Sequence, residues 1–594
     1  MASTQVEQQT VVSARDVISL YIKGDVKALL TYKKICNAFD LVEKWDENAS
    51  RQFLSQILEI GDLVDHTCKS LVENIVKLRW CKIPTDLRQR WRNLLCEIGA
   101  RHVVHLDKIY QCAVKNFSPS ITTNENGQVQ SEFTPEQQSE FYGMAHSIVA
   151  QLLVVVPVSS KMAVKIMYKG FPYHTAPVIK VTDYIRNLIN VSEYATSIRE
   201  DVWACIIDHL VTIDTLIGRP TDGDDSGAEI FLLDEEEEEH RADMKLEECN
   251  RDHVDKLNQS MKDIIDYINA SHGIEIDDEA ASWMHCSGLI SDDVFSSIHS
   301  ALSKHLLTAS NVRFVSFLWL FLAGLKEEYT DRVLSSLWEI LIRPSSVDGE
   351  ARRSQGAASF LAAFIARAKY IDIRVAQVYL ARMSSYLCAY VDRVGLSSRT
   401  IIPGLSHHGV FYAMSNAFFL AFAFRYKEMV KSSMLDEVRH WGIGRFIHSS
   451  LDPLKYSVPS VGRCFSAVSR SLQLVYCSHV QPLCMNESNR PFDPYFPFDS
   501  YFLDKTMDSI VPLTRKFSPM KEDAANLSRE LSSGRKMKKE EDDDEGAIDF
   551  LDDMEDMDYG SVKQYGPLST GLFTVYSTSP GLRPFQSGSP MDTR

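Results

Sequence analysis

The segment "FLSQILEIGDLVDHTCKSLVENIV", residues 53–76, contains the pattern that decides the fold. Its apolar residues recur at intervals of three and four, and the resulting stripe consists of Ile57, Ile60, Val64, Cys68, Leu71 and Ile75. The opposite side of the same predicted helix carries Glu59, Asp62, Lys69 and Glu73. This spacing predicts an amphipathic helix that buries one face.

The same period recurs along most of the 594 residues, whereas alternating strand patterns are scarce. It is found in residues 12–39, 86–117, 137–168, 178–217, 251–270, 291–343, 354–392, 409–430 and 434–480. Helices of about 12 to 25 residues with short breakers between them favour stacked antiparallel pairs over separate bundles. We therefore predict an all-α chain that forms an irregular HEAT-repeat-like α-solenoid, although no regular repeat signature is present.

Composition divides the chain into four predicted segments. Residues 1–217 form the N-terminal half of the solenoid and include a polar loop at 118–135, which is a candidate for disorder. Residues 218–245 are an acidic flexible loop, and residues 246–515 form the C-terminal half with an aromatic strap at 491–506. Residues 516–594 are low in apolar content and predict a disordered tail with acidic and Ser-Pro sequences.

The net charge of −17 comes from two short runs. Residues 234–239 contribute −6 and residues 540–558 contribute −12, which leaves about +1 for the rest of the chain. Acidity is therefore a property of a loop and a tail. Within the loop, the short sequence "AEIFLL" at 228–233 is a candidate linear docking motif.

The twelve cysteines lie in apolar stretches without a C-x-x-C spacing, which predicts buried free thiols in a reducing compartment. The N-terminal sequence lacks the basic and apolar regions of a signal peptide, so secretion is not expected. Two apolar runs, 314–325 and 410–424, are shorter than the roughly 20 residues that a bilayer requires. They predict buried helices, and no membrane partner is expected.

No sequence motif for phosphate cradling, zinc proteolysis or serine hydrolysis is present. His102 and His105 would share a helix face and could hold a metal with Asp107, but half-buried structural histidines are the favoured interpretation because no further ligand is evident. His407 and His408 precede Gly409 and predict a loop that enters a buried helix. We predict no catalytic residues, no metal site and no cofactor, and expect function to reside in partner-binding surfaces.

The segment "EARRSQGAASFLAAFIARAKYIDIRVAQVYL", residues 350–380, combines small residues with basic ones. The small residues, which would let neighbouring helices approach closely, are Ala357, Ala358, Ala362 and Ala363. The basic residues form a candidate contact for DNA or for an acidic protein surface: Arg352, Arg353, Arg367, Lys369 and Arg374. Solvated helix ends with local ion pairs are the alternative interpretation.

The tail carries candidate regulatory sequences. Ser518, Ser579 and Ser589 each precede proline, as proline-directed kinases require, and are candidate phosphosites. A short basic run is a candidate for nuclear import and contains Arg535, Lys536, Lys538 and Lys539.

Four ordered blocks resemble the RNA polymerase I-specific transcription initiation factor IA family. They are "GAASFLAAFIARAKYI", "HHGVFYAMSNAFFLAFAFRYKEM", "LDPLKYSVPSVGRCFSAVSRSLQLVYC" and "YFPFDSYFLDKT". The similarity covers roughly residues 200 to 510 and is weaker before that. The chain departs from the family pattern at Ser415, Asp452, Ser500 and Asp504.

The resemblance implies a non-enzymatic initiation factor with a HEAT-like solenoid. Its implied partners are the stalk of RNA polymerase I, the promoter-bound selectivity factor at rRNA genes and protein kinases; contact with the rDNA promoter and dimerisation of the free protein stay open. The implied location is the nucleus and nucleolus, with a cytoplasmic pool, and the implied process is ribosome biogenesis. The alternative from another class is a solenoid adaptor or transport receptor, which the helical period allows equally well.

The strap "PFDPYFPFDSYFLDKT" cannot be helical because Pro494 and Pro497 fix φ and lack an N–H donor. We expect its Phe and Tyr rings to cover the last helix pair as a cap. Direct docking of a partner is the alternative interpretation.

Overall fold

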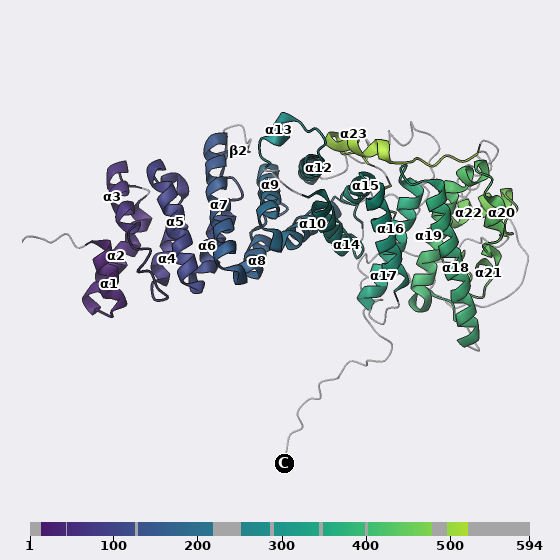
Figure 1. The fold of residues 1–594 in the computed structure, drawn as a ribbon, viewed down its shortest axis with the longest axis horizontal. Helices are drawn as coiled ribbons and strands as arrows, with labels where there is room; N and C mark the ends of the chain where they lie inside the picture. The colour runs from purple at the N-terminus through teal and green to yellow at the C-terminus, as the bar shows by residue number, and fades with distance from the viewer. Residues whose placement is uncertain are drawn as a thin grey trace, which may run out of the picture. The chain divides into compact units, whose positions relative to one another are not determined.

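The structure is a computed structural model and describes residues 13–42, 44–124, 129–217, 251–284, 290–309, 311–343, 348–397, 402–477, 496–499 and 501–520. Helices joined by short connections dominate these residues (Figure 1). The prediction of an all-α fold is therefore confirmed. The predicted acidic loop lies outside the described residues, as does the tail beyond residue 520.

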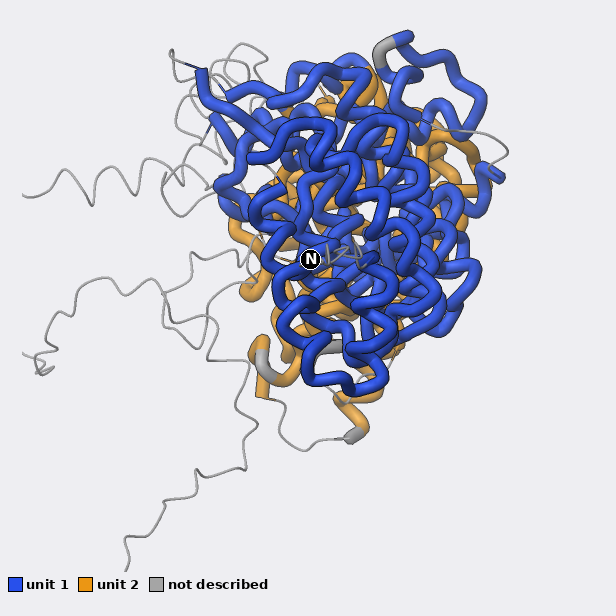
Figure 2. The backbone as a smooth tube through the Cα atoms, turned by 90° about the vertical axis from the view of Figure 1, so that its left-hand side faces the viewer, with its two compact units in different colours: residues 1–218, 246–305, 502–508 blue, residues 219–245, 306–501, 509–594 orange. Residues whose placement is uncertain are grey.

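The chain divides into two compact units, which Figure 2 distinguishes by colour. Unit 1 comprises residues 1–218, 246–305 and 502–508. Its helices are α1 (Ala14–Ile22), α2 (Val26–Val42), α3 (Glu47–Ile57), α4 (Lys69–Lys77), α5 (Thr85–Arg101), α6 (Val103–Lys115), α7 (Pro135–Val155), α8 (Ser160–Gly170), α9 (Val178–Tyr194), α10 (Arg199–Thr215), α12 (Arg251–Ser271), α13 (Asp278–Ala281) and α14 (Ser291–Leu306). Several sequence neighbours pack on one another, among them α1 on α2, α5 on α6 and α9 on α10, and α5 also contacts α7, α6 contacts α8, and α9 contacts α12. This pairwise stacking is the HEAT-like pattern that the helical period predicted.

Unit 2 comprises residues 219–245, 306–501 and 509–594. Its helices are α15 (Ser316–Gly324), α16 (Glu327–Ile342), α17 (Asp348–Arg367), α18 (Ile373–Ser397), α19 (Leu405–Lys431), α20 (Leu435–Arg439), α21 (Ile443–Ile447) and α22 (Pro459–Ser471), and the short α23 (Met507–Ile510) spans residues of both units. The long helix α19 contacts α17, α18 and α22 and forms the centre of this unit. The predicted buried runs are found in α15 and α19, and every residue of α15 from Ser316 to Ala323 is buried.

The helix α12 belongs with the N-terminal helices, although the predicted domain boundary at 218–245 separates them. The carboxylate of Asp263 on α12 accepts two hydrogen bonds from Arg186 on α9, at 2.8 and 2.9 Å. Asp263 is only 3% exposed, so this pair is buried where α12 packs on α9. A bidentate buried ion pair of this kind fixes register between helices.

The segment at residues 53–76 is not one helix. The helix α3 ends at Ile57 and α4 begins at Lys69, and turns fill the interval. The side chain of Asp65 accepts a hydrogen bond from the backbone N–H of Thr67 at 2.9 Å, which favours a turn over a helix. The predicted burial is nevertheless correct, since none of the six stripe residues has exposed surface.

The polar loop predicted at 118–135 is ordered in its described part. Strands β1 (Ile121–Thr123) and β2 (Val129–Ser131) pair antiparallel, with Ile121 opposite Ser131. Glu132 follows β2 and pairs with Arg79 through both carboxylate oxygens, at 2.6 and 2.7 Å. The prediction of disorder was wrong here because a short hairpin satisfies its own backbone groups.

The predicted free thiols are confirmed for the nine cysteines that the structure describes, and all of these except Cys81 are buried. Burial raises the pKa of Cys96 to about 11. In the described residues no single helix has the length and composition to cross a bilayer, although α7 and α8, bent by 117°, meet those criteria together.

The helix α17 packs closely against the backbone beyond α14. A Cβ at Gly356 would lie 2.1 Å from the carbonyl oxygen of Leu307. The four alanines that follow in α17 are at most 1% exposed, as predicted for a close helix contact: Ala357, Ala358, Ala362 and Ala363. Close approach of backbones at this point requires glycine.

Arg425 on α19 has no exposed surface. Its guanidinium donates to the carbonyl oxygen of Ile365 at 3.0 Å, to that of Ile371 at 3.1 Å and to the carboxylate of Glu428 at 2.9 Å. Burial, and secondarily the charge of Arg515, lowers the pKa of Arg425 to about 10, while Glu428 opposes this shift. The side chain therefore remains cationic at neutral pH and joins α19 to the connection between α17 and α18.

The substitution Gly356→Ala is expected to lower the free energy of unfolding by about 2 kcal/mol, because the added methyl group meets backbone atoms that cannot rotate away. The matched control is Gly395→Ala in α18, where nothing lies within 4 Å of the added Cβ. The control is expected to gain about 0.5–1 kcal/mol from improved helix propensity. Thermal unfolding of the full chain, followed by circular dichroism, compares the two, and equal midpoints would contradict the close contact.

The substitution Arg425→Met is expected to cost about 3–5 kcal/mol, because it leaves two buried carbonyl groups without their donor and removes one of the two cationic partners of Glu428. Arg439→Met removes an exposed ion pair to Asp436 of 2.7 Å and is expected to cost less than about 1 kcal/mol. Thermal midpoints of the two variants test this difference. A small loss at Arg425 would show that the bridge is not needed for stability.

Candidate partner-binding surfaces

Within the described part of the strap, Phe498 is 1% exposed and has a φ of 64°. Its ring centroid lies 5.6 Å from Phe317 on α15, and 5.8 and 4.9 Å from Phe360 and Phe364 on α17. The expectation that the strap covers the last helix pair was therefore wrong for this residue. The rings on α15 and α17 provide inclined aromatic contacts, which explains why Phe498 packs there.

Asp504 and Lys505, near the end of the strap, pack on α12 within unit 1. The backbone N–H of Lys505 donates to Asn258 Oδ1 at 3.2 Å, and its ammonium donates to Gln259 Oε1 at 2.5 Å. Asp504, one of the departures from the family pattern, accepts a hydrogen bond from the side-chain amide of Asn258. The aspartate at this position therefore has a hydrogen-bond partner on α12 in this chain.

Beyond the strap, residues 513–520 run along α17 and α19. Thr514 forms an isolated antiparallel bridge with Ala368, and the N–H of Arg515 donates to the carbonyl oxygen of Arg367 at 2.6 Å. Phe517 is 6% exposed and lies 5.2 Å from Phe424, measured between ring centroids. The sequence prediction placed residues 516–520 in a disordered tail. The apolar residue Phe517 was the sequence feature that indicated docking, and it was overlooked.

One candidate phosphosite lies in this docked segment. Ser518 is exposed, and its hydroxyl accepts a hydrogen bond from the ammonium of Lys427 at 2.9 Å. The same ammonium donates to the carbonyl oxygen of Pro519 at 3.2 Å, and Met520 N–H donates to Tyr426 at 2.7 Å. The other candidates, Ser579 and Ser589, and the basic run at 535–539 lie outside the described residues.

The candidate basic cluster does not form one surface. Arg352 and Arg353 lie near the start of α17, whereas Arg367 ends this helix, so about 20 Å separates the two groups. Arg367 is 8% exposed, donates to Asp499 at 3.0 Å and lies 5.0 Å over the ring of Phe424. Of the remaining members, Arg352, Lys369 and Arg374 are exposed.

His102 and His105, which were considered as metal ligands, have structural roles. His102 lies between α5 and α6 in an extended conformation, so the predicted helix 86–117 is broken there. His105 is 2% exposed and its Nε2 lies 2.8 Å from the carbonyl oxygen of Asp65. His407 and His408 were predicted to lie in a loop before a buried helix, but α19 already begins at Leu405 and kinks at His408, which has a φ of −129°. The described residues contain no group of three side chains placed to hold a metal ion.

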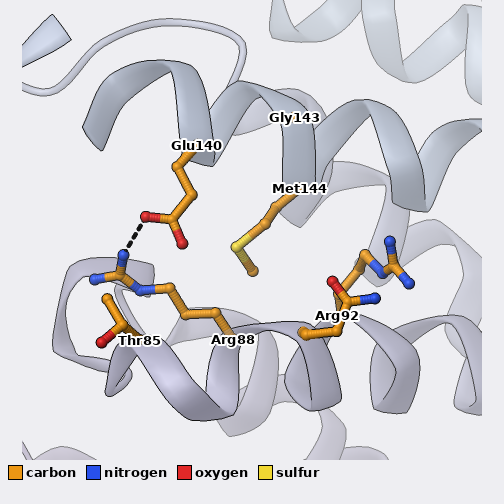
Figure 3. Close-up of a pocket in the computed structure, with 7 residues that line it drawn as sticks. Thr85, Arg88, Arg92, Glu140, Gly143 and Met144 are labelled. Atoms are coloured by element: carbon orange, nitrogen blue, oxygen red, sulfur yellow. Dashed lines mark hydrogen bonds and ion pairs between the residues drawn. The ribbon is translucent and has the colours of Figure 1, made fainter. Parts of the chain in front are cut away.

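A groove of about 270 Å³ lies between α5 and α7 in unit 1 (Figure 3). It is lined by Thr85, Arg88, Gln89, Arg92, Glu140, Gly143 and Met144. Arg88 pairs with Glu140 across the groove, and Arg92 donates to Ser147 at 2.8 Å. Its lining contains no nucleophile paired with a general base, so the groove does not suggest catalysis.

Comparison with known proteins gives a consistent result. A family profile described as "RNA polymerase I specific transcription initiation factor RRN3" matches residues 16–522. The chain is 37% identical to the RNA polymerase I-specific transcription initiation factor tif-1A of Caenorhabditis elegans, over 96% of this chain and 94% of the relative. It is 22% identical to RRN3 of Mus musculus, over 90% of this chain and 84% of that protein.

A solved structure described as the crystal structure of RNA polymerase I transcription initiation factor Rrn3 has the same fold. It aligns with a TM-score of 0.56 and 16% identity, and the alignment covers 84% of this chain and 96% of that chain. The relatives are named as transcription initiation factors and not as enzymes. Since the family profile spans most of its length, the chain belongs to the RRN3 family of RNA polymerase I-specific transcription initiation factors.

Proposed function

We propose that this protein binds the stalk of RNA polymerase I, makes the polymerase competent to initiate, and bridges it to the promoter-bound selectivity factor at rRNA genes. The observation that carries the proposal is the family match over residues 16–522, which includes all four blocks of the sequence resemblance. The protein would act by contact alone, through the extended surfaces that a helical solenoid offers. We place it in the nucleus and nucleolus, with a cytoplasmic pool, where kinases can modify it.

The exposed members of the basic cluster are candidates for contact with an acidic surface of a partner or with promoter DNA. Arg352 lies near the start of α17. Lys369 follows the end of α17, and Arg374 is the second residue of α18. Arg367 is not a candidate because its guanidinium is buried against Asp499 and Phe424. Exposed positive charge of this kind acts mainly on association rate and orientation.

Ser518 is the candidate phosphosite whose surroundings the structure describes. A phosphate adds about −1.5 to −2 charges at neutral pH. Because the Ser518 hydroxyl lies 2.9 Å from the ammonium of Lys427, we propose that phosphorylation strengthens the docking of residues 514–520 on α19.

Affinity purification of the tagged full chain from growing cells, with mass spectrometry, is expected to recover RNA polymerase I subunits including the stalk. The triple variant Arg352→Glu, Lys369→Glu and Arg374→Glu is expected to recover about tenfold less polymerase, because opposite charges at a contact become like charges. The matched control reverses three other exposed cations of unit 2, at Arg382, Lys431 and Arg439. Equal recovery of polymerase by both variants would show that Arg352, Lys369 and Arg374 do not contribute to the contact. Recovery of transport cargo without polymerase would contradict the proposed role in initiation. Imaging of the tagged chain in the same cells checks its location.

Limited trypsin digestion tests the Ser518 proposal, because Arg515 and Lys516 provide cleavage sites inside the docked segment. The variant Ser518→Asp is expected to slow cleavage there by roughly two- to fivefold. Lys427→Met is expected to remove that difference, and Ser579→Asp serves as a control of equal charge. Identical cleavage rates for wild type and Ser518→Asp would contradict a phosphate-strengthened contact.

A further inference from the structure

An exposed apolar surface lies where α7 ends. Val154, Val155 and Val158 are 79%, 54% and 93% exposed, and we call these three residues the valine surface. Val103 and Val104 at the start of α6 are also exposed, at 62% and 54%. Contiguous exposed apolar residues of this kind commonly mark an interaction site.

The ends of α5 and α7 meet close to this surface. A Cβ at Gly99 would lie 3.0 Å from Leu152 Cδ2 and 3.2 Å from Ile109 Cδ1. Val103 follows Gly99 by four residues, and Val154 follows Leu152 by two. Both valines are therefore close in sequence to this contact between α5 and α7. The fold presents apolar side chains from both sides of this contact to solvent.

A row of lysines continues from the valine surface along α8. Lys161, Lys165 and Lys169 are spaced by four residues and all are exposed, so they share one side of the helix. Residues 141–182 contain no Asp or Glu, which leaves this row without acidic neighbours in sequence. Asp201 and Asp208 on α10 act electrostatically on Tyr168, which precedes Lys169 at the far end of α8.

The chain itself contains a segment of matching chemistry and order. Residues 228–239, "AEIFLLDEEEEE", place four apolar side chains directly before six acidic ones. The surface likewise places apolar side chains directly before cationic ones. We propose that residues 228–239 dock on the valine surface and the lysine row of α8, with Ile230–Leu233 on the valines and the acidic run beside Lys161 and Lys165.

The connection is long enough for this docking. Twelve residues lie between Ile217, at the end of the described N-terminal helices, and Ile230, and the thirteen Cα-to-Cα steps of this connection span up to roughly 43 Å. The helix α10 that precedes it is about 25 Å long and packs on α8. Because the tether makes the encounter intramolecular, weak apolar and electrostatic contacts suffice to populate the docked state.

Hydrogen–deuterium exchange of the full chain tests the proposal. Backbone amides in residues 228–233 are expected to exchange about fivefold more slowly in the intact chain than in a synthetic peptide of residues 226–241. The variant Lys161→Glu and Lys165→Glu is expected to restore the rate of the free peptide. High salt is expected to weaken the protection, since both lysines are exposed.

The matched control is Lys33→Glu with Lys34→Glu, which makes the same change in charge at exposed positions of α2. It is expected to retain the slow exchange of the intact chain, and Val158→Asn is expected to lose it without any change in charge. Circular dichroism confirms that each variant is folded. Exchange at the free-peptide rate in the wild type, or equal protection in both lysine variants, would overturn the proposal.

Discussion

The bridge made by Arg425 is the interaction on which the arrangement of unit 2 depends. Its guanidinium bonds carbonyl groups at Ile365 and Ile371, where α17 ends and the chain turns toward α18. The end of a helix leaves carbonyl groups that need donors, and here the donor comes from a third helix. Glu428 neutralises the buried cation and also pairs with Arg515, at 3.3 Å, so the docked segment 513–520 is held through the same charges. Helix packing and the path of the C-terminal segment are therefore coupled.

The helical period predicted the architecture, because burial of one face is a local property of sequence. The stripe from Ile57 to Ile75 was correctly predicted to be buried, yet the helix breaks between α3 and α4. Periodicity does not distinguish a helix from turns that bury the same side chains, and the hydrogen bond from Thr67 to Asp65 decides between them.

The surfaces were predicted less well than the fold. Arg367 belonged to a basic cluster in sequence, but its position at the end of α17 buries it against Asp499. Ser518 was recognised from its Ser-Pro sequence, whereas its contact with Lys427 spans 91 residues and has no local signature. The four family blocks identified the chain because they preserve order and residue type. Which of their residues are exposed depends on contacts between segments that are far apart in the chain, and local sequence patterns do not reveal such contacts.

The position of the strap has a consequence for biosynthesis. Asn258 on α12 receives its partner Asp504 from 246 residues further along the chain, and Phe317 receives Phe498 almost as late. Synthesis proceeds at about 5–20 residues per second, so these sites wait at least roughly 10 seconds for their partners on the ribosome. During that interval the aromatic faces of α15 and α17 are uncovered, which makes the nascent chain a substrate for chaperones that bind exposed apolar surface. Translation that terminates before residue 496 would leave those faces open permanently.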